Sequence, residues 1–402
     1  MRQLYKTPFG DYNLKRIPDI DKNLQAWNSA DTYLLNHLFE MVQDQLSTGS
    51  GLDLEKAKIL ILNDDFGALT LPMAQFGCDS YSDSFISHLA IRKNLKVNCP
   101  YSLDKVNFLK STDVLEQDYD VVLFKNVKTL ALLQDEMLKL AAHIKPDTLL
   151  LGASMARNLQ KSTLETLSKT IGEVQSSLTW KKARLIHVQF DPVRYFHLTA
   201  NQQVTTDNIV SYQLEGGKEV LHNLANVFSR NKLDIGSRFF LQHFPPEKSP
   251  QPDKRSYKKI IDLGCGNGVL ALKAAQKFPG ASIICVDESY MALASAKLTL
   301  EANVNTQDCP VDYISANALT DFKQNSVELI LCNPPFHQQY ALGDATAWQM
   351  FKQAKETLVK GGELWIVGNR HLGYHLKLKK IFGNQKLIAA NNKFVVLKAV
   401  KH

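Results

Sequence analysis

The stretch that decides the fold is KIIDLGCGNG, residues 259–268. After Lys259, its first half is an apolar run broken only by Asp262, which is typical of a strand buried on both faces of a sheet. Three glycines then alternate with other residues, and glycine permits the positive φ that a tight turn after a strand requires. An apolar segment with helical spacing comes next. The stretch therefore predicts a strand, a glycine turn and a helix, the repeating unit of an α/β sheet.

The same alternation continues toward the C-terminus. Apolar runs at 281–286, 311–315 and 327–332 read as further strands, and polar residues follow each of them. Strands separated by helical segments form mostly parallel, doubly wound sheets, which bind ligands beyond the carboxyl ends of their strands. We therefore expect the binding residues in the loops that follow these strands.

The first half of the chain repeats this pattern. Strands are expected at 58–62, at 121–124, at 148–151 and in a run that ends near Asp83, and helices at 24–45, 84–97 and 129–144. In this repeat Gly67 corresponds to Gly268, Asp83 to Asp287 and Lys125 to Asn333. The separation in sequence between corresponding residues increases slowly, from 201 through 204 to 208. Such drift is typical of a duplicated domain with small insertions, although two unrelated α/β domains would look similar. We expect domains at 1–203 and 204–402, divided within the polar stretch 201–207.

The glycine turn predicts a nucleotide-type ligand. Gly264, Gly266 and Gly268 have the spacing GxGxG, which differs from the GxGxxG of dinucleotide binders. Asp287 ends the next strand, where a carboxylate can accept the hydroxyls of a ribose. Simpler explanations exist for both, since glycine turns also form for steric reasons and Asp287 could cap the helix that follows it.

Asn333-Pro334-Pro335-Phe336 follows the strand at 327–332 and is expected to be a stiff loop, because each proline fixes its own φ and restrains the residue before it. Rigidity there fixes two acceptors, the amide oxygen of Asn333 and the carbonyl of Pro334, beside the ring of Phe336. Two acceptors and a ring can hold a planar exocyclic amine and stack on its heterocycle. This pattern predicts a site for alkylating a base amine, and the alternative is a proline-punctuated turn with Phe336 in the core.

The N-terminal copy lacks this chemistry. Asn63 and Asp65 stand where Gly264 and Gly266 stand in the second copy, and Lys125 takes the place of Asn333. We therefore expect this copy to bind no cofactor and instead to grip a substrate or to support its partner domain.

Composition and charge set further bounds. The six cysteines contain no CxxC pair, so free thiols are expected and structural zinc is not. No apolar run approaches the length of a membrane span, no secretory signal is evident, and a cytoplasmic protein is expected. Of the 47 basic residues, eleven lie in the last 52 positions, beside only two acids. This basic segment suggests a polyanionic partner, although a solvated lysine face would have the same composition.

Taken together, these residues resemble the bacterial ribosomal RNA guanine-N2 methyltransferases of the RlmG/RsmC group, in which an inactive methyltransferase-like domain precedes an active one. The resemblance covers nearly the whole chain. Within the group, the continuation His337-Gln338-Gln339 and the segments 24–27 and 391–394 look most similar to the large-subunit enzyme RlmG. The resemblance implies two tandem class I, Rossmann-like domains and methyl transfer from S-adenosylmethionine, without a metal, to a guanosine N2 amine of 23S rRNA.

The resemblance also implies roles for single residues. Asp262 would orient the amino end of the cofactor, Gly264, Gly266 and Gly268 would receive its methionine and ribose parts, and Asp287 would hold the ribose. Asn317 and Ala318 would hold the adenine, although a simple turn fits them equally well. Asn333 and Pro334 would orient the target amine, and Phe336 would stack on the base. The candidates for RNA contacts are His337, Arg370, Lys377, Lys379 and Lys380.

Three other functions remain open from the residues alone. The acceptor could be 16S rRNA rather than 23S rRNA. It could also be an adenine N6 or a glutamine N5, since enzymes for both use Asn-Pro-Pro-aromatic loops. A third reading is an RNA-binding ribosome assembly factor with no activity, which the intact glycine turn disfavours.

Overall fold

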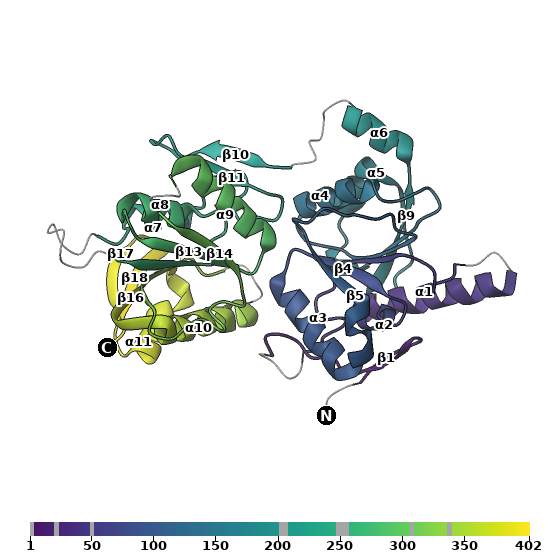
Figure 1. Ribbon diagram of the computed structural model, residues 1–402, viewed down its shortest axis with the longest axis horizontal. Coiled ribbons are helices and arrows are strands. Elements are labelled where there is room, and N and C mark those ends of the chain that lie inside the picture. Colours follow the sequence, from purple (N-terminus) through teal and green to yellow (C-terminus); the bar gives the residue numbers. More distant parts are fainter. Residues whose placement is uncertain are drawn as a thin grey trace. The chain divides into compact units, whose positions relative to one another are not determined.

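The computed structural model describes residues 4–19, 24–48, 52–200, 208–246, 257–305, 309–335 and 340–402. The chain forms two compact units, Met1–Asn208 and Ile209–His402 (Figure 1). The expected boundary between residues 203 and 204 lies in 201–207, outside the described residues.

The C-terminal unit is built on a seven-stranded mixed sheet with the order β14-β13-β12-β15-β16-β18-β17. The first five strands in this order are parallel, and β18 runs antiparallel to both of its neighbours. The bounds are β12 Lys259–Leu263, β13 Ser282–Asp287, β14 Val311–Ser315, β15 Val327–Cys332, β16 Leu358–Asn369, β17 Lys386–Ala390 and β18 Phe394–Val400.

Helices cover both faces of this sheet (Figure 1). One apolar core joins the sheet to α7 (Ile235–Gln242), α8 (Val269–Lys277) and α9 (Tyr290–Asn303). A second core joins the opposite face to α10 (Tyr340–Thr357) and α11 (Tyr374–Phe382), with the short helix η3 (Arg370–Leu372) before α11. The strands are apolar on both faces because both faces are covered.

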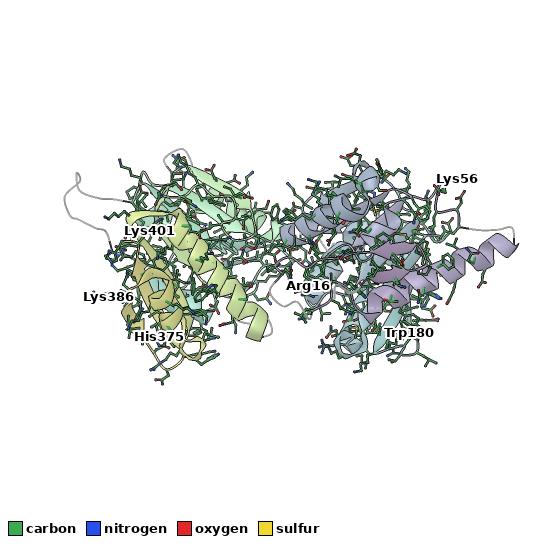
Figure 2. All side chains as sticks on the ribbon, turned by 90° about the horizontal axis from the view of Figure 1, so that it is seen from below. Arg16, Lys56, Trp180, His375, Lys386 and Lys401 are labelled. Carbon is green, nitrogen blue, oxygen red and sulfur yellow. The ribbon has the colours of Figure 1, made fainter. Side chains whose placement is uncertain are left out.

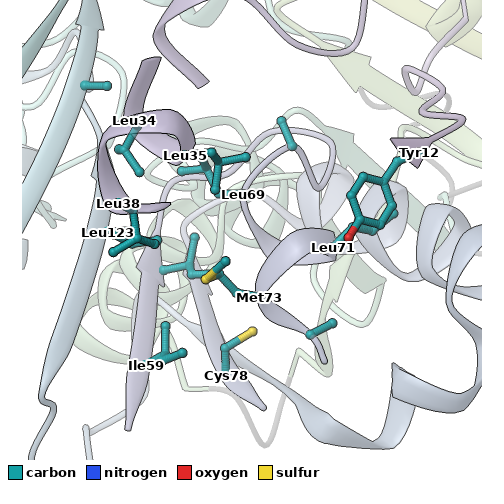
Figure 3. Packing of buried hydrophobic residues seen from close by; sticks show 14 of the residues in the cluster. Tyr12, Leu34, Leu35, Leu38, Ile59, Leu69, Leu71, Met73, Cys78 and Leu123 are labelled. Carbon is teal, nitrogen blue, oxygen red and sulfur yellow. The ribbon is translucent and has the colours of Figure 1, made fainter. Parts of the chain in front are cut away.

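The N-terminal unit has the same topology, with the strand order β5-β4-β3-β6-β7-β9-β8. The helices α1, α2 and α3 pack on one face, and α4, α5 and α6 on the other. In the first of these cores, Leu34, Leu35 and Leu38 of α1 pack near Ile59 and Leu123 of the sheet (Figure 3). The bounds are β3 Ile59–Leu62, β4 Cys78–Ser82, β5 Val106–Lys110, β6 Val121–Lys125, β7 Leu149–Met155, β8 Gly172–Ser176, β9 Ala183–Phe190, α1 Ser29–Thr48, α2 Thr70–Met73, α3 Phe85–Asn98, α4 Leu130–Ala141, α5 Lys161–Thr170 and α6 Pro192–Ala200, with short helices η1 Pro100–Lys105 and η2 Ala156–Asn158. Two matching sheets in sequence confirm the predicted tandem Rossmann-like fold.

A two-stranded hairpin precedes each sheet, and in both units side chains of a helix hold the hairpin segment by hydrogen bonds to its backbone. The pairs are β1 Tyr5–Thr7 with β2 Gly10–Tyr12, and β10 Val210–Gln213 with β11 Val220–Asn223. In the first unit, Asn98 and Asn94 of α3 accept the backbone N–H groups of Asn13 and Lys15. In the second unit, Asn303 and Thr299 of α9 accept those of Val220 and His222. The repeated clamp shows that the correspondence between the units extends beyond their sheets.

Two details predicted from the sequence are wrong, the start of the first helix and the residue that corresponds to Asp287. The first helix begins at Ser29 rather than at residue 24, because Asn28 accepts the N–H of Ala30 and caps the helix there. The residue that corresponds to Asp287 is Ser82 rather than Asp83. The N–H of Ala316 bonds the carbonyl of Asp287 in one unit, and the N–H of Ser111 bonds that of Ser82 in the other.

All six cysteines are free thiols, as predicted, and five of them are buried. No helix within the described residues is long and apolar enough to cross a membrane. The same part of the chain contains no group of three or more histidine, cysteine or acidic side chains arranged to hold a metal ion.

Candidate active site

The register of the parallel strands brings the predicted site residues together at one edge of the C-terminal sheet. Leu263 pairs with Val286 on one side and with Cys332 on the other. The next residue along each strand is therefore Gly264, Asp287 or Asn333, and the three positions adjoin at the carboxyl edge. This is the edge at which open α/β sheets bind ligands.

The glycine turn leaves open space above its backbone. Gly264 and Gly266 have φ values of +74° and +53°. Among the described atoms, a Cβ at Gly266 would meet nothing within 4 Å, and one at Gly264 would meet only Cε of Met350 at 3.5 Å. The missing side chains therefore leave room for a ligand to reach the backbone.

Gly268 has a different reason to be glycine. A Cβ there would lie 2.9 Å from Cβ of Ala296, so its absence permits α8 and α9 to pack closely. Its expected part in holding the cofactor stays a prediction.

Asp262 is fully buried beneath the turn. Its Oδ2 accepts the N–H of Ala271 in the first turn of α8, at 2.9 Å. Its Oδ1 has no hydrogen-bond partner among the residues that the structure describes. Burial raises the pKa of this carboxyl to about 7, and the nearby charge of Asp287 adds to the effect although the bond from Ala271 opposes it. A buried carboxylate oxygen of this kind favours a cationic partner.

The carboxylate of Asp287 is held in place by backbone groups. Its Oδ2 accepts the N–H of Gly266 at 2.9 Å, and its Oδ1 accepts that of Ser289 at 3.0 Å. The side chain of Ser289 caps α9 by accepting the N–H of Ala292. Asp287 therefore links the glycine turn to the start of α9 without being the cap residue itself.

Asn317 and Ala318 lie in a tight turn that α10 holds. Ala318 has a φ of +52°, and the carbonyl of Asn317 accepts the N–H of Thr320. Two glutamines one helical turn apart on α10 fix this turn. Gln349 donates to Oδ1 of Asn317 at 3.2 Å, and Gln353 accepts the N–H of Leu319 at 2.9 Å. The sequence-based prediction missed both glutamines, although their spacing of four residues places them on one helix face.

Asn333 begins the loop after β15 with its amide in a defined orientation. Its Nδ2 donates to Oγ of Ser237 at 3.0 Å. Its Oδ1 is buried and has no partner within the described part of the chain. Pro334 is buried beside it, whereas Phe336 and His337 lie outside the described residues. Ser237 is another residue that the prediction missed, and it directly follows the Asp-x-Gly segment at residues 234–236.

Ion pairs fill the corresponding edge of the N-terminal unit. Lys125, in the position of Asn333, lies 2.9 Å from Oδ1 of Asp31 and 2.9 Å from Oδ2 of Asp65. Burial alone would lower the pKa of Lys125, but Asp31, Asp65 and Asp64 outweigh burial and raise it well above the ordinary value. Asn63, in the position of Gly264, donates to Glu136 at 2.8 Å.

Asp64, which lies between Asn63 and Asp65 in the sequence, has a different role. Its carboxylate accepts the backbone N–H groups of residues 67–70, and Oγ1 of Thr70 donates to it as well. It therefore serves as a helix cap, whereas Asp65 pairs with Lys125 at the edge of the sheet.

The predicted RNA-contact residues differ in their surroundings. Lys377 is largely buried and pairs with Asp344 at 2.6 Å, and Lys380 lies over the ring of Trp348. Arg370 donates to the carbonyl of Asn391. Lys379 is exposed on α11, and Lys386 and His375 also lie at the surface of the C-terminal unit (Figure 2). The structure thus ties Lys377 into the fold and leaves Lys379 open to solvent.

Comparisons with known proteins agree with this division into two units. Residues 218–398 match the family "Methyltransferase small domain", and residues 2–192 match the "RLMG N-terminal domain" family. Among solved structures, the 16S rRNA N2 methyltransferase (RsmC) of T. Thermophilus, in complex with AdoMet and guanosine, has a TM-score of 0.72 at 18% identity. The match covers 100% of this chain and 98% of that one. A ribosomal protein L11 methylase from Lactobacillus delbrueckii subsp. bulgaricus, with 16% identity and a TM-score of 0.31, covers 42% of this chain and 77% of its own.

The C-terminal unit is thus a methyltransferase domain with a Rossmann-like fold. The chain therefore joins an N-terminal segment that matches the RLMG N-terminal domain family to a C-terminal segment that matches the small methyltransferase domain family.

Proposed function

We propose that the protein transfers a methyl group from S-adenosylmethionine to the exocyclic N2 amine of one guanosine in 23S rRNA. The observation that carries the proposal is the side-chain amide of Asn333. Its nitrogen is engaged by Ser237, so its oxygen is the atom left to accept a hydrogen bond at the carboxyl edge of the sheet. An acceptor held there by a proline-stiffened loop fits an amine substrate.

The residues present fit the cofactor. The turn at Gly264 and Gly266 has room for a ligand against its backbone. Asp262 would meet the cationic amino end, since a buried carboxylate oxygen favours such a partner. Asp287 would hold the ribose, and Asn317 with Ala318 would line the place of the adenine.

Bound S-adenosylmethionine supplies a methyl group on a sulfonium, which is already strongly electrophilic. What remains for the protein is mainly positioning. Asn333 Oδ1 and the carbonyl of Pro334 would each accept one hydrogen of the target amine, and this would direct the nitrogen lone pair at the methyl group. Phe336 would stack on the base. No strong base is needed, because the methylated ammonium loses its proton readily.

A base must leave its stack to reach this pocket. His337, Arg370, Lys379 and Lys380 would then contact the surrounding RNA. Lys377 is a weaker candidate than the sequence suggested, because Asp344 already neutralises its charge. The N-terminal domain, residues 1–203, would grip the RNA or support the catalytic domain, because ion pairs occupy its own edge.

Two comparisons bear on the substrate in different ways. The solved structure that spans the chain holds guanosine and is described as an enzyme for 16S rRNA. The N-terminal family match instead carries the name of the large-subunit enzyme. We give the N-terminal match more weight, because the resemblance at residues 337–339 and 391–394 points the same way. Methylation of 16S rRNA is the alternative.

The test is nucleoside mass mapping of both rRNAs with and without the gene, repeated in vitro with labelled cofactor and purified protein. The proposal expects one N2-methylguanosine of 23S rRNA to disappear in the deletion strain. Loss from 16S rRNA would favour the alternative, and loss of a methyladenosine would overturn the choice of base.

The Asn333→Ala variant tests the amine clamp itself. We expect methyl transfer to fall by at least about 100-fold, because a catalytic group that positions the nucleophile is lost. Cofactor affinity, measured by calorimetry, should stay within about twofold because Asn333 acts on the amine. Full activity in this variant would refute the clamp.

A further inference from the structure

Ser237 lies in the first turn of α7, where the local structure fixes its position. Asp234 caps the helix and accepts the N–H of Ser237 through Oδ2 at 2.9 Å. Ser237 is buried, with 7% of the residue exposed. A hydroxyl held by a capped helix and by burial has little freedom to move.

The side chain of Asn333 is held with its amide nitrogen toward this hydroxyl. Ser237 Oγ accepts from Nδ2 of Asn333 at 3.0 Å, across 96 residues of sequence. The oxygen of the amide therefore points away from Ser237, where it remains an acceptor. A flipped amide would instead present an N–H donor, which would repel the hydrogens of a substrate amine.

The N-terminal unit supports a pairing of these two positions. The third residue of α1 is Asp31, as Ser237 is the third residue of α7. Asp31 contacts Lys125, the counterpart of Asn333. The two positions therefore touch in both units, with a neutral hydrogen bond in one and an ion pair in the other.

We propose that Ser237 is a positioning residue which holds the side-chain amide of Asn333 with its oxygen toward the substrate, so that the site selects an amine. This inference rests on the proposed amine methylation. It adds that the selection depends on α7, an element that precedes the first strand of the catalytic sheet.

The first test compares Ser237→Ala with Ser237→Thr on the rRNA that the wild-type enzyme methylates. Ser237→Ala should lower kcat about 10- to 100-fold, because the amide can then flip or drift. Its cofactor Kd and melting temperature should stay near the wild-type values. Ser237→Thr keeps a hydroxyl and should recover most of the lost rate. Equal losses in both variants, or no loss in Ser237→Ala, would overturn the proposal.

The second test removes the distinction between the two ends of the amide. In Asn333→Asp both terminal atoms are oxygens, so an incorrect flip no longer exists. Ser237→Ala should therefore cost less than about threefold in that background, compared with at least tenfold beside Asn333. Equal costs in the two backgrounds would show that Ser237 acts only on the fold. Should Asn333→Asp be too slow to assay, the threonine comparison decides alone.

These outcomes are separable from a failure of the proposed function. If wild-type protein methylates neither rRNA, the proposed function fails before any variant is made. If it methylates an adenine amine, the choice of guanine fails, and the two Ser237 tests can still be run on that amine.

Discussion

Replacing Lys125 should lower the stability of the N-terminal unit, because its ion pair with Asp31 is buried. Lys125→Asn puts the residue of the catalytic copy into the equivalent position and leaves Asp31 without its cation. The Asp31 side chain is 0% exposed and the Lys125 side chain 12% exposed, at an N–O distance of 2.9 Å. Removing one partner of such a pair costs about 3–5 kcal/mol. Most of that is the penalty of an unpaired buried charge.

The effect should depend on pH. Burial raises the pKa of Asp31, so in the variant this carboxyl takes up a proton as the solution becomes more acidic. At pH 5 Asp31 of the folded variant binds a proton more readily than Asp31 of the unfolded chain, and this favours the folded state. The loss of stability relative to the wild-type protein should therefore be smaller at pH 5 than at pH 8.

The double variant Asp31→Ser with Lys125→Asn is the matched control. It installs the neutral pair that the catalytic unit uses, Ser237 with Asn333, and should recover much of the lost stability. Asp65 remains in this variant, but its side chain is 58% exposed and stays solvated.

Hydrogen exchange followed by mass spectrometry reads the two units separately. Peptides from β3 and β6 should report the loss, and peptides from β12 and β15 should not change. A loss below about 1 kcal/mol in Lys125→Asn, or no recovery in the double variant, would refute the assignment of the ion pair as a buried support.

Two further predictions follow from single positions. Burial raises the pKa of Glu136 from 4.5 to about 8, so the folded state binds a proton that the unfolded state lacks, and stability falls as pH rises between these values. Glu136→Gln should therefore stabilise the protein more at pH 9 than at pH 5.5 in thermal unfolding, and an equal gain at both pH values would contradict the shift. Gly268→Ala should cost more stability than Gly266→Ala, because alanine is strained at the positive φ of both positions and its Cβ at position 268 would also lie 2.9 Å from Ala296. Gly266→Ala should in addition weaken cofactor binding, since its Cβ would occupy the open space above the turn. The comparison needs only melting temperatures and cofactor Kd values, and the reverse ranking would show that Gly266 serves the fold.

Much of the architecture could be predicted from local sequence. Apolar runs that alternate with helical periods specified two mostly parallel sheets, because strands covered on both faces must be apolar throughout. The glycines at 264 and 266 and the prolines at 334 and 335 marked the loops, because these residues restrict or widen backbone freedom in known ways. These signals lie within a few residues of one another and need no tertiary information.

The contacts of the site depended on the tertiary structure. Ser237 and Asn333 are 96 residues apart, and nothing in either segment alone indicates that they touch. Asp287 corresponds to Ser82 rather than to Asp83, and only the hydrogen bonds of the two sheets show this. A shift of one residue between the two units leaves the apolar pattern of the strands unchanged.

The sequence by itself determined that the chain holds two α/β units, one with and one without a glycine turn. Only the structure shows that ion pairs from Lys125 to Asp31 and Asp65 take the place of the site in the N-terminal unit. It also shows that the side-chain oxygen of Asn333, rather than the nitrogen, is available to bond a substrate. Both answers depend on residues that adjoin only after the helix before each sheet has packed against it. Burial makes such contacts important for stability, because leaving a polar group unpaired costs far more free energy inside a protein than in water.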